Sequence, residues 1–281
     1  MMNRFSTPEW VKRHFFAFRA YDSVSEAQID KIRQGIARFN VVNPVASIVV
    51  PAYNEEENLL STLSSFSEIV PQVPTELLVV NNNSSDRTQE ILDRCGVTSI
   101  FQPVQGRTYA RQLGLETAKG KIILSADADS IYPSDWGNAF VQTLLHRPEV
   151  AVVYGRYSFI PSKSINRLGL AVHEFGGELM FDRRKGVDLC INAIGFNTGF
   201  RKEQALAVGG YDPDKLAFHN QRSEDGWLAQ SLYKAYGAIE LIKNQGRVWT
   251  SDRRLLEEGS LAKASINRVI RYINGTNLAN T

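Results

Sequence analysis

Between residues 46 and 146 the chain repeats one pattern, in which a short apolar run precedes a longer amphipathic stretch. The apolar runs, which predict strands, occupy residues 47–51, 76–80, 99–101 and 121–125. The amphipathic stretches, which predict helices, occupy residues 55–69, 86–95, 108–118 and 133–146. Strands that alternate with helices of this length form βαβ units around a parallel sheet. We therefore predict an α/β fold, whose ligands bind beyond the carboxyl ends of the strands.

The rest of the chain lacks this regular alternation. Two predicted helices, one starting at Pro8 and one over residues 25–39, form a preface over residues 1–43. Further strands are predicted at residues 150–157, 194–201, 238–242 and 248–250, and further helices at residues 164–180, 223–236 and 261–273. We expect one α/β domain over residues 44–258, with two unlike halves that meet at residue 150, and a C-terminal helix over residues 259–281.

Composition narrows the class of protein. The chain has 281 residues and a net charge of +2, which is too small to indicate nucleic-acid binding. Cys95 and Cys190 are not spaced as metal ligands, and we predict that they are reduced thiols. No apolar run reaches the roughly 18 residues of a transmembrane helix, and the first residues lack the apolar core of a signal peptide. These features predict a cytoplasmic protein.

Two carboxylates follow the strand predicted at residues 121–125. Asp127 and Asp129 are two positions apart, so in extended chain their side chains point the same way and can converge on one cation. Two oxygen ligands at the mouth of a crevice suit Mg²⁺ or Mn²⁺ and, with it, a phosphate-bearing ligand. An acidic turn that caps the next helix explains this motif equally well.

Polar and aromatic side chains also follow the first two strands. Pro51 and Tyr53 suit contact with a planar base, whereas Asn54 is suited to cap the next helix. The run of asparagines at residues 81–83 offers amides that hydrogen-bond a base edge or a ribose. A plain polar turn is an almost equal interpretation of this run.

Charged pairs occur at three later positions. Arg107 and Arg111 lie four apart at a predicted helix start, which is either an anion site or a solvated basic face. Glu224 and Asp225 follow the predicted cap Ser223, and this local pattern alone favours ordinary helix capping. A third pair, Arg253 and Arg254, is predicted to lie in a loop as a diphosphate ligand or an exposed pair.

Taken in order, these segments resemble the family 2 glycosyltransferases of the GT-A fold. The matching segments are residues 50–56, 80–88, 106–111, 127–129, 195–201 and 224–225. The resemblance implies a GT-A domain over residues 44–258, with a nucleotide-sugar half at residues 44–150 and an acceptor half at residues 151–258. It implies an inverting transferase that moves a sugar from a nucleotide diphosphate sugar to a glycan or lipid-linked acceptor.

The resemblance also assigns roles to residues. The nucleotide-sugar donor would be bound by Pro51, Ala52, Tyr53, Glu55, Asn81, Asn83, Arg107, Arg111, Asp127, Ala128 and Asp129. Mg²⁺ or Mn²⁺ would be held by Asp129, with Asp127 beside it. The acceptor wall would be formed by Gly195, Phe196, Asn197 and Thr198. Asn81 stands where relatives usually carry an aspartate that reads uracil or thymine, so a UDP-sugar is favoured while GDP- and dTDP-sugars stay open.

For catalysis, the resemblance makes Asp225 the general base, and Glu224 would position either the acceptor or nearby backbone. Asp225 would remove a proton from the acceptor hydroxyl, a task for which a carboxylate with an ordinary pKa suffices at neutral pH. Many relatives carry a histidine after this base as a metal ligand, and none follows Asp225 here. The Gln-x-x-Arg-Trp motif of processive relatives is also absent, so we expect one sugar to be added per encounter.

The residues argue against two other functions. A sugar nucleotidyltransferase would carry a glycine-rich, lysine-bearing loop after the first strand, and residues 52–55 do not supply one. A non-catalytic nucleotide-sugar binder would be expected to lose the metal or base carboxylates, and both are retained.

The N-terminal segment mixes basic and aromatic residues, as interfacial helices do. These residues are Trp10, Lys12, Arg13, Phe15, Phe16 and Phe18. They suggest peripheral contact with the inner face of the cell membrane, although a helix packed on the domain is the more favoured alternative.

Overall fold

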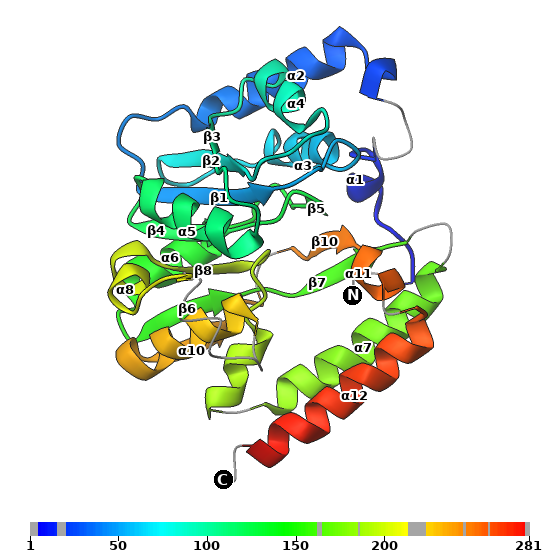
Figure 1. Cartoon of the computed structure of the whole chain (residues 1–281), viewed down its shortest axis with the longest axis vertical. Coiled ribbons are helices and arrows are strands. Elements are labelled where there is room, and N and C mark those ends of the chain that lie inside the picture. The colour runs from blue at the N-terminus through cyan, green and yellow to red at the C-terminus, as the bar shows by residue number, and fades with distance from the viewer. Residues whose placement is uncertain are drawn as a thin grey trace.

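The computed structural model describes residues 5–15, 21–161, 165–184, 186–212, 223–243, 246–257 and 259–278 (Figure 1). Within these residues, the side chains at 186–188, 254, 256 and 271–278 are outside the description. The predicted α/β fold is confirmed: helices cover a central sheet on both faces, and a smaller sheet lies beside it.

The central sheet of the described residues has seven strands in the order β3-β2-β1-β4-β8-β6-β9. Its strands are β1 (Ala46–Ala52), β2 (Thr75–Asn81), β3 (Ser99–Phe101), β4 (Ile122–Ser125), β6 (Val150–Tyr154), β8 (Thr198–Arg201) and β9 (Ala238–Leu241). Strands β3, β2, β1 and β4 are mutually parallel, whereas β8 is antiparallel to both β4 and β6. The parallel half brings the carboxyl ends of β1, β2 and β4 to one edge of the sheet.

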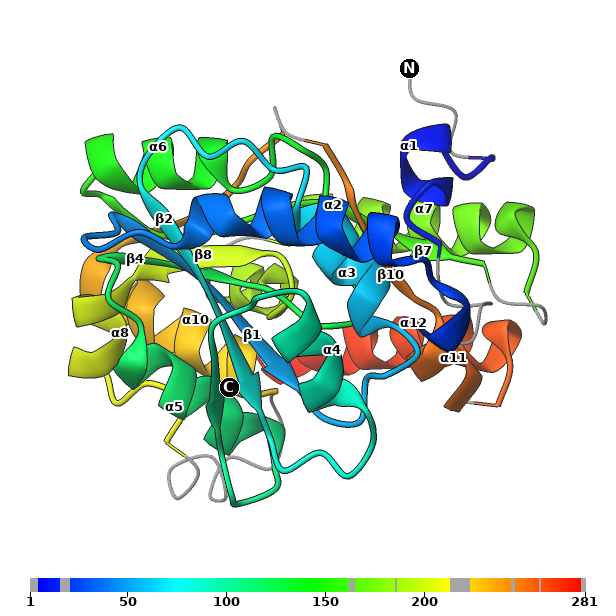
Figure 2. The same cartoon turned by 90° about the horizontal axis from the view of Figure 1, so that it is seen from above.

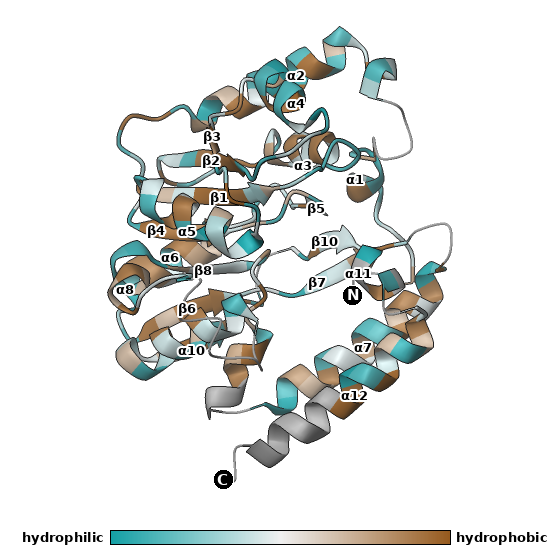
Figure 3. Cartoon of the chain, in the orientation of Figure 1, coloured by the Kyte–Doolittle hydropathy of each residue, from teal (hydrophilic) through white to brown (hydrophobic). Residues whose placement is uncertain are grey.

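Side chains alternate between the two faces of the sheet and join two separate cores. Ile48 and Val50 of β1 pack in one core, whereas Val49 packs in the other. The first core includes apolar side chains from α2 (Glu26–Ile36), α3 (Leu59–Phe66), α4 (Thr88–Arg94) and α6 (Asn138–His146). The second includes side chains from α5 (Arg107–Thr117), α8 (Lys202–Ala207) and α10 (Glu224–Tyr236). The central strands are accordingly hydrophobic along much of their length (Figure 3).

The smaller sheet has the order β5-β10-β7. It consists of β5 (Ser130–Ile131), β10 (Val248–Ser251) and β7 (Tyr157–Ile160), and three helices lie near it: α7 (Arg167–Arg183), α11 (Arg253–Glu257) and α12 (Leu261–Leu278). Two predictions fail here. The single strand expected at residues 150–157 is two strands in different sheets, and Arg253 begins a helix instead of lying in a loop.

The N-terminal segment packs onto the domain. Helix α1 (Glu9–Lys12) lies at the same end of the molecule as α7 (Figure 2). Its Val11 is buried with Ile131 and Trp249, and Trp10 and Phe15 pack around them. Phe16 and Phe18 lie outside the described residues. This placement supports the packed-helix alternative over membrane contact by this segment. Among the described residues, no helix is long and apolar enough to cross a membrane.

The remaining elements are the 3-10 helices η1 (Tyr21–Ser23), η2 (Ala37–Phe39) and η3 (Gly186–Asn192). Helix α2 begins with a full capping box, in which Ser25 and Gln28 bond each other's backbone N–H groups. The capping role expected of Asn54 is wrong. Its φ is +51°, its side chain accepts a hydrogen bond from the Ser85 N–H, and α3 is preceded by Asn58 instead.

Candidate active site

A cavity of about 310 Å³ opens beyond the carboxyl ends of β1 and β4. It is lined by Pro51, Ala52, Tyr53, Glu55, Asn82, Gln105, Gly106, Arg107, Asp127, Ala128, Asp129 and Arg253. We call this space the donor cavity. Nine of these twelve residues are among those expected to bind the donor or its diphosphate, so β1, β4 and the start of α5 bring together residues from separate motifs.

The asparagine run is arranged differently from the prediction. Asn81 is buried, donates to Gln89 and accepts from the Ser84 N–H, and it does not line the donor cavity. Asn83 is likewise absent from the lining and adopts a positive φ of +57°. The middle residue, Asn82, lines the cavity and holds the next loop.

Asn82 fixes the loop between β3 and α5 through its amide. Its Nδ2 donates to the carbonyl of Val104 at 2.6 Å, and its Oδ1 accepts from the Gly106 N–H at 2.8 Å. This loop carries Gln105, whose side chain donates to the Tyr53 hydroxyl at 3.2 Å. No sequence signal identified Gln105. Asn82 belongs to the asparagine run considered above, but only Asn81 and Asn83 were assigned to the donor site.

Asp127 and Asp129 both line the donor cavity, as expected from their spacing. Each side chain is mostly buried, with 14% and 15% of its surface exposed. Asp127 accepts a hydrogen bond from Arg111 at 2.8 Å, whereas Asp129 lies 3.3 Å from the Arg253 guanidinium. The two carboxylates therefore share one cavity but pair with different arginines.

Arg253 reaches the donor cavity from the first turn of α11. Its Nη2 donates to Glu55 at 2.9 Å and lies 3.3 Å from Asp129. Its side chain is about half exposed, so the guanidinium can also face a bound anion. For Arg254, the side chain lies outside the described residues.

Arg111 does not line the donor cavity; it lies behind it. Its side chain is only 2% exposed and projects from α5 into the space between β4 and α10. It bonds Asp127, the Ser125 hydroxyl and the carbonyl of Gly195. It also lies 3.2 Å from Asp225, at ion-pair distance but without hydrogen-bond geometry. Arg111 therefore joins a donor-cavity carboxylate to the candidate base.

The candidate base begins α10. Ser223 caps this helix by accepting from the Gly226 N–H, which confirms the predicted cap. The two following carboxylates point to two arginines of α5: Asp225 to Arg111, and Glu224 to Arg107 at 2.5 Å. Capping alone does not account for these pairs, because they bridge two helices far apart in the sequence.

Burial raises the pKa of Asp225, and the negative charges of Glu224 and Asp127 raise it further. The positive charge of Arg111 opposes this rise, but the net pKa is above the ordinary value. The proposed role does not require a raised pKa, but the structure provides one. A raised pKa makes the carboxylate a stronger proton acceptor when it is ionised.

Gly195 allows this close packing. Its carbonyl accepts a hydrogen bond from Arg111 at 2.9 Å. A Cβ atom at this position would collide with both the Asp225 carboxylate and the Arg111 guanidinium. Only glycine leaves room for the ion pair to lie against the backbone.

A second cavity, of about 120 Å³, adjoins Asp127 and Asp129 on the side of β7. We call it the acceptor-side cavity; it is lined by Asp127, Asp129, Tyr157, Phe159, Ile194, Phe196, Thr250, Ser251 and Leu255. Of the four residues expected in the acceptor wall, only Phe196 lines it. Asn197 and Thr198 are buried, and the Asn197 amide binds Trp136 and the Arg156 carbonyl.

A larger cavity, of about 550 Å³, adjoins the donor cavity at Asp129 and Arg253. It lies between the N-terminal end of α3 and the segment that joins β10 to α11, and Glu57, Asp252 and Glu257 contribute carboxylates to its lining. Asp127, Asp225 and Arg111 do not line it.

The chain matches the model of glycosyl transferase family 2 over residues 47–206. It is 24% identical over 218 residues to the glucosyl-dolichyl phosphate glucuronosyltransferase of Haloferax volcanii, covering 72% of this chain and 67% of that protein. A second relative from that organism, glycosyltransferase AglE, is 32% identical over 108 residues, and the chain spans only 36% of its length.

Solved structures share the fold. The crystal structure of S. aureus TarS with UDP matches with a TM-score of 0.57 at 16% identity, over 73% of this chain and 60% of that one. The glucosyl-3-phosphoglycerate synthase of Mycobacterium tuberculosis, crystallised with Mn²⁺, UDP-glucose and phosphoglyceric acid, matches with a TM-score of 0.55 at 20% identity, over 87% of this chain and 83% of that one. The architecture is the GT-A fold, and the chain belongs to glycosyl transferase family 2.

Proposed function

We propose that this chain transfers a sugar from a nucleotide diphosphate sugar to an acceptor hydroxyl, with inversion at the anomeric carbon and Asp225 as the general base. The observation that carries the proposal is the Arg111 network. One buried guanidinium pairs with Asp127 in the donor cavity and with Asp225 at the start of α10. This connection favours a reaction centre between the donor and acceptor-side cavities.

In this mechanism Asp225 accepts the proton of the acceptor hydroxyl as that oxygen attacks the anomeric carbon. Attack from the face opposite the leaving diphosphate inverts the configuration at that carbon. Arg111 orients the Asp225 carboxylate, and Arg107 and Glu224 form a neighbouring ion pair. The raised pKa of Asp225 is consistent with its role as a base.

The carboxylates suit a divalent metal ion. Asp129 would hold Mg²⁺ or Mn²⁺ with Asp127 nearby, and the described residues contain no group of three histidine, cysteine or carboxylate ligands. Both ions are commonly held by one or two carboxylates together with substrate phosphates, so this sparse ligand set fits them. A bound ion would stabilise the charge that develops on the departing diphosphate.

A UDP-sugar is the favoured donor, supported by the UDP and UDP-glucose bound in the two structural relatives. Tyr53 would face the nucleobase of the donor. Asn82 holds the loop that carries Gln105, whose side chain contacts Tyr53 and would lie close to the nucleobase. The Arg253 guanidinium would bind the diphosphate. The Asn81 amide is hydrogen-bonded within the protein and does not select one nucleobase, so GDP- and dTDP-sugars are tested as well.

The acceptor is proposed to be a glycan or a lipid-linked sugar. Three aromatic side chains in the acceptor-side cavity, Tyr157, Phe159 and Phe196, support a sugar acceptor because aromatic rings pack against the apolar faces of sugars. The name of the Haloferax relative supports a lipid-linked acceptor.

The proposal is tested with a panel of UDP-, GDP- and dTDP-sugars, following thermal shift and hydrolysis with Mn²⁺, with Mg²⁺ and after chelation. We expect a UDP-sugar to stabilise the protein and to be hydrolysed slowly, and chelation to abolish both effects. No response to any of these sugars would refute the proposal.

Asp225→Asn separates catalysis from donor binding. We expect it to lower turnover by about a hundredfold or more and to leave the UDP thermal shift unchanged, because Asp225 does not line the donor cavity. Glu203→Gln, at the first turn of α8, is the matched control for losing a carboxylate at a helix start. Equal turnover in Asp225→Asn and the control would show that the base is misassigned.

A further inference from the structure

Helix α7 presents an unusual exposed surface. The four apolar side chains Leu168, Val172, Phe175 and Leu179 are 59%, 65%, 61% and 44% exposed. At about 100° a residue these positions fall within about 60° of one another, so they form one stripe along the helix. Isolated exposed apolar residues are ordinary, but a stripe of four large ones marks a contact surface.

Helix α12 continues this surface. Ile266, Val269 and Ile270 are 59%, 40% and 49% exposed and share one side of that helix. The two helices run parallel, because Gly169 lies beside Leu261 and Gly177 beside Arg268. Between these contacts, the His173 ring bonds the Ser265 hydroxyl at 2.7 Å. Figure 1 shows them side by side at an edge of the molecule, at the opposite end from α2.

The two stripes point to the same side of the helix pair. Around the axis of α7, the side that contacts α12 lies about a third of a turn from the four exposed apolar side chains. The third side of α7 carries Leu170 and Glu174, which pack against β7. On α12, Leu261, Ser265 and Arg268 face α7, which leaves the Ile266 stripe turned away from the sheet. We call the combined surface of these seven side chains the α7–α12 face.

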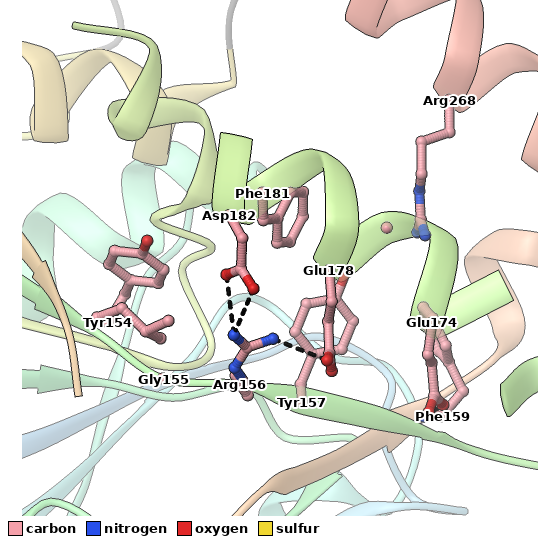
Figure 4. A pocket seen from close by; sticks show the side chains of 12 residues that line it. Tyr154, Gly155, Arg156, Tyr157, Phe159, Glu174, Glu178, Phe181, Asp182 and Arg268 are labelled. Carbon is pink, nitrogen blue, oxygen red and sulfur yellow. Dashed lines mark hydrogen bonds and ion pairs between the residues drawn. The ribbon is translucent and has the colours of Figure 1, made fainter. Parts of the chain in front are cut away.

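The inner side of α7 holds its charged groups in ion pairs. Glu174 pairs with Arg167, and Figure 4 shows Arg156 between Glu178 and Asp182, which it contacts at 2.7 and 2.8 Å. The space among these side chains is about 20 Å³, enough for about one water molecule and too small for a substrate. The acids of α7 are therefore neutralised by arginines.

Among the described residues at the border of the α7–α12 face, the uncompensated charge is positive. Arg183 ends α7 and Lys263 lies in the first turn of α12, both exposed, and no carboxylate in the described part of the chain pairs with either. The sequence of α12 contains no aspartate or glutamate. An apolar stripe with basic residues at its border matches the surface of an anionic membrane. A second copy of this chain would instead bring the same positive charges together.

We propose that the α7–α12 face docks on an anionic lipid bilayer. Phe159, which lines the acceptor-side cavity, packs against Leu170 on the inner side of α7. Docking would therefore hold that cavity one helix away from the lipid headgroups. The proposal concerns membrane contact and does not depend on the chemistry of sugar transfer.

Flotation with vesicles tests the proposal, using phosphatidylglycerol mixed with phosphatidylcholine, or phosphatidylcholine alone. We expect the protein to float with the anionic vesicles and less with the neutral ones. The double variant Phe175→Ser/Leu179→Ser should bind the anionic vesicles about tenfold more weakly, because two buried apolar contacts are lost. Val42→Ser/Val70→Ser, which removes two exposed valines from other segments, is the matched control and should bind as the wild type does.

The contribution of charge is tested separately. Arg183→Gln and Lys263→Gln should each weaken binding to anionic vesicles by about fivefold, and added salt should reduce the difference from wild type. Equal binding to neutral vesicles, or no effect of Phe175→Ser/Leu179→Ser, would overturn the proposal. So would an equilibrium-sedimentation dimer that the same double variant dissociates, since the face would then serve self-association. Donor hydrolysis measured without vesicles distinguishes these outcomes from a failure of the proposed transferase activity.

Discussion

Replacing Arg111 with methionine is the most direct test of how the candidate active site is held together. The side chain is 2% exposed and lies 2.8 Å from Asp127 and 3.2 Å from Asp225. Methionine keeps much of the length and packing of arginine but removes the charge. Arg111→Met therefore leaves two mostly buried carboxylates without their shared cation.

The expected magnitude follows from that geometry. Removing one partner of a buried ion pair lowers the free energy of unfolding by about 3–5 kcal/mol. An arginine beside a carboxylate lowers its pKa by about 1–3 units, so the pKa of Asp225, already raised by burial, should rise by about that amount. Because Asp225 accepts a proton only when ionised, activity is lost as the pH falls through its pKa. The acid limb of the kcat/KM profile should therefore move about 1–3 pH units upward.

Two assays measure these effects. Urea denaturation of wild type, Arg111→Met, Asp225→Asn and the double variant gives a coupling free energy, which we expect to be about 1–3 kcal/mol. The pH profile of kcat/KM gives the shift of the acid limb. Arg167→Met is the matched control, because it breaks the similarly buried pair with Glu174 and should destabilise the protein without moving the acid limb.

The reasoning would be refuted by an unchanged acid limb in a folded Arg111→Met protein. Additive stability effects of Arg111→Met and Asp225→Asn would also contradict it, because they would show that the two side chains do not interact. Arg111→Lys should give intermediate values, since lysine retains the charge but not the several directed hydrogen bonds of the guanidinium.

Two further predictions concern neighbouring residues. Gly195→Ala should lower kcat/KM by about a hundredfold, since the new Cβ would displace Asp225 and Arg111. Gly176→Ala is the control, because a Cβ there meets open space and kcat/KM should stay at the wild-type value. Equal kcat/KM values for the two variants would show that Gly195 is not needed for this close packing. Arg253→Gln should raise the KM for the donor about tenfold with little change in kcat, because an ionic contact to the diphosphate is lost in both ground and transition states. An unchanged KM in steady-state assays would remove Arg253 from the donor site.

Much of the parallel half of the sheet could be predicted from local sequence. The runs at residues 47–51, 76–80 and 121–125 are strands that are buried on both faces of the sheet, as apolar segments of this length predict. The run at residues 99–101 is also a strand, but it lies at the edge of the sheet and is partly exposed. The first two helices between them were predicted too long, whereas the third, predicted at residues 108–118, is shifted by one residue. Asp127 and Asp129 could also be chosen from the sequence, since polar residues that follow parallel strands meet at one edge.

The second half was harder to predict. Residues 150–157 are apolar enough for one strand, but the chain leaves the central sheet after Tyr154 and enters the smaller sheet at Tyr157. The orientation of the individual asparagines at residues 81–83 could not be predicted from the sequence either. Whether Asn81 or Asn82 faces the donor cavity depends on their hydrogen-bond partners, Gln89 and Val104, and not on the run itself.

The sequence by itself determined the α/β alternation, the family and the carboxylates at the strand ends, because these depend on periodicity and on neighbouring residues. The tertiary structure alone decided that Arg111 is a buried link to Asp225 and not a surface anion site, since its partners come from other elements. It also decided which side of α7 remains exposed. A helix pattern shows that apolar side chains are present, but only packing against β7 and α12 shows which of them are covered.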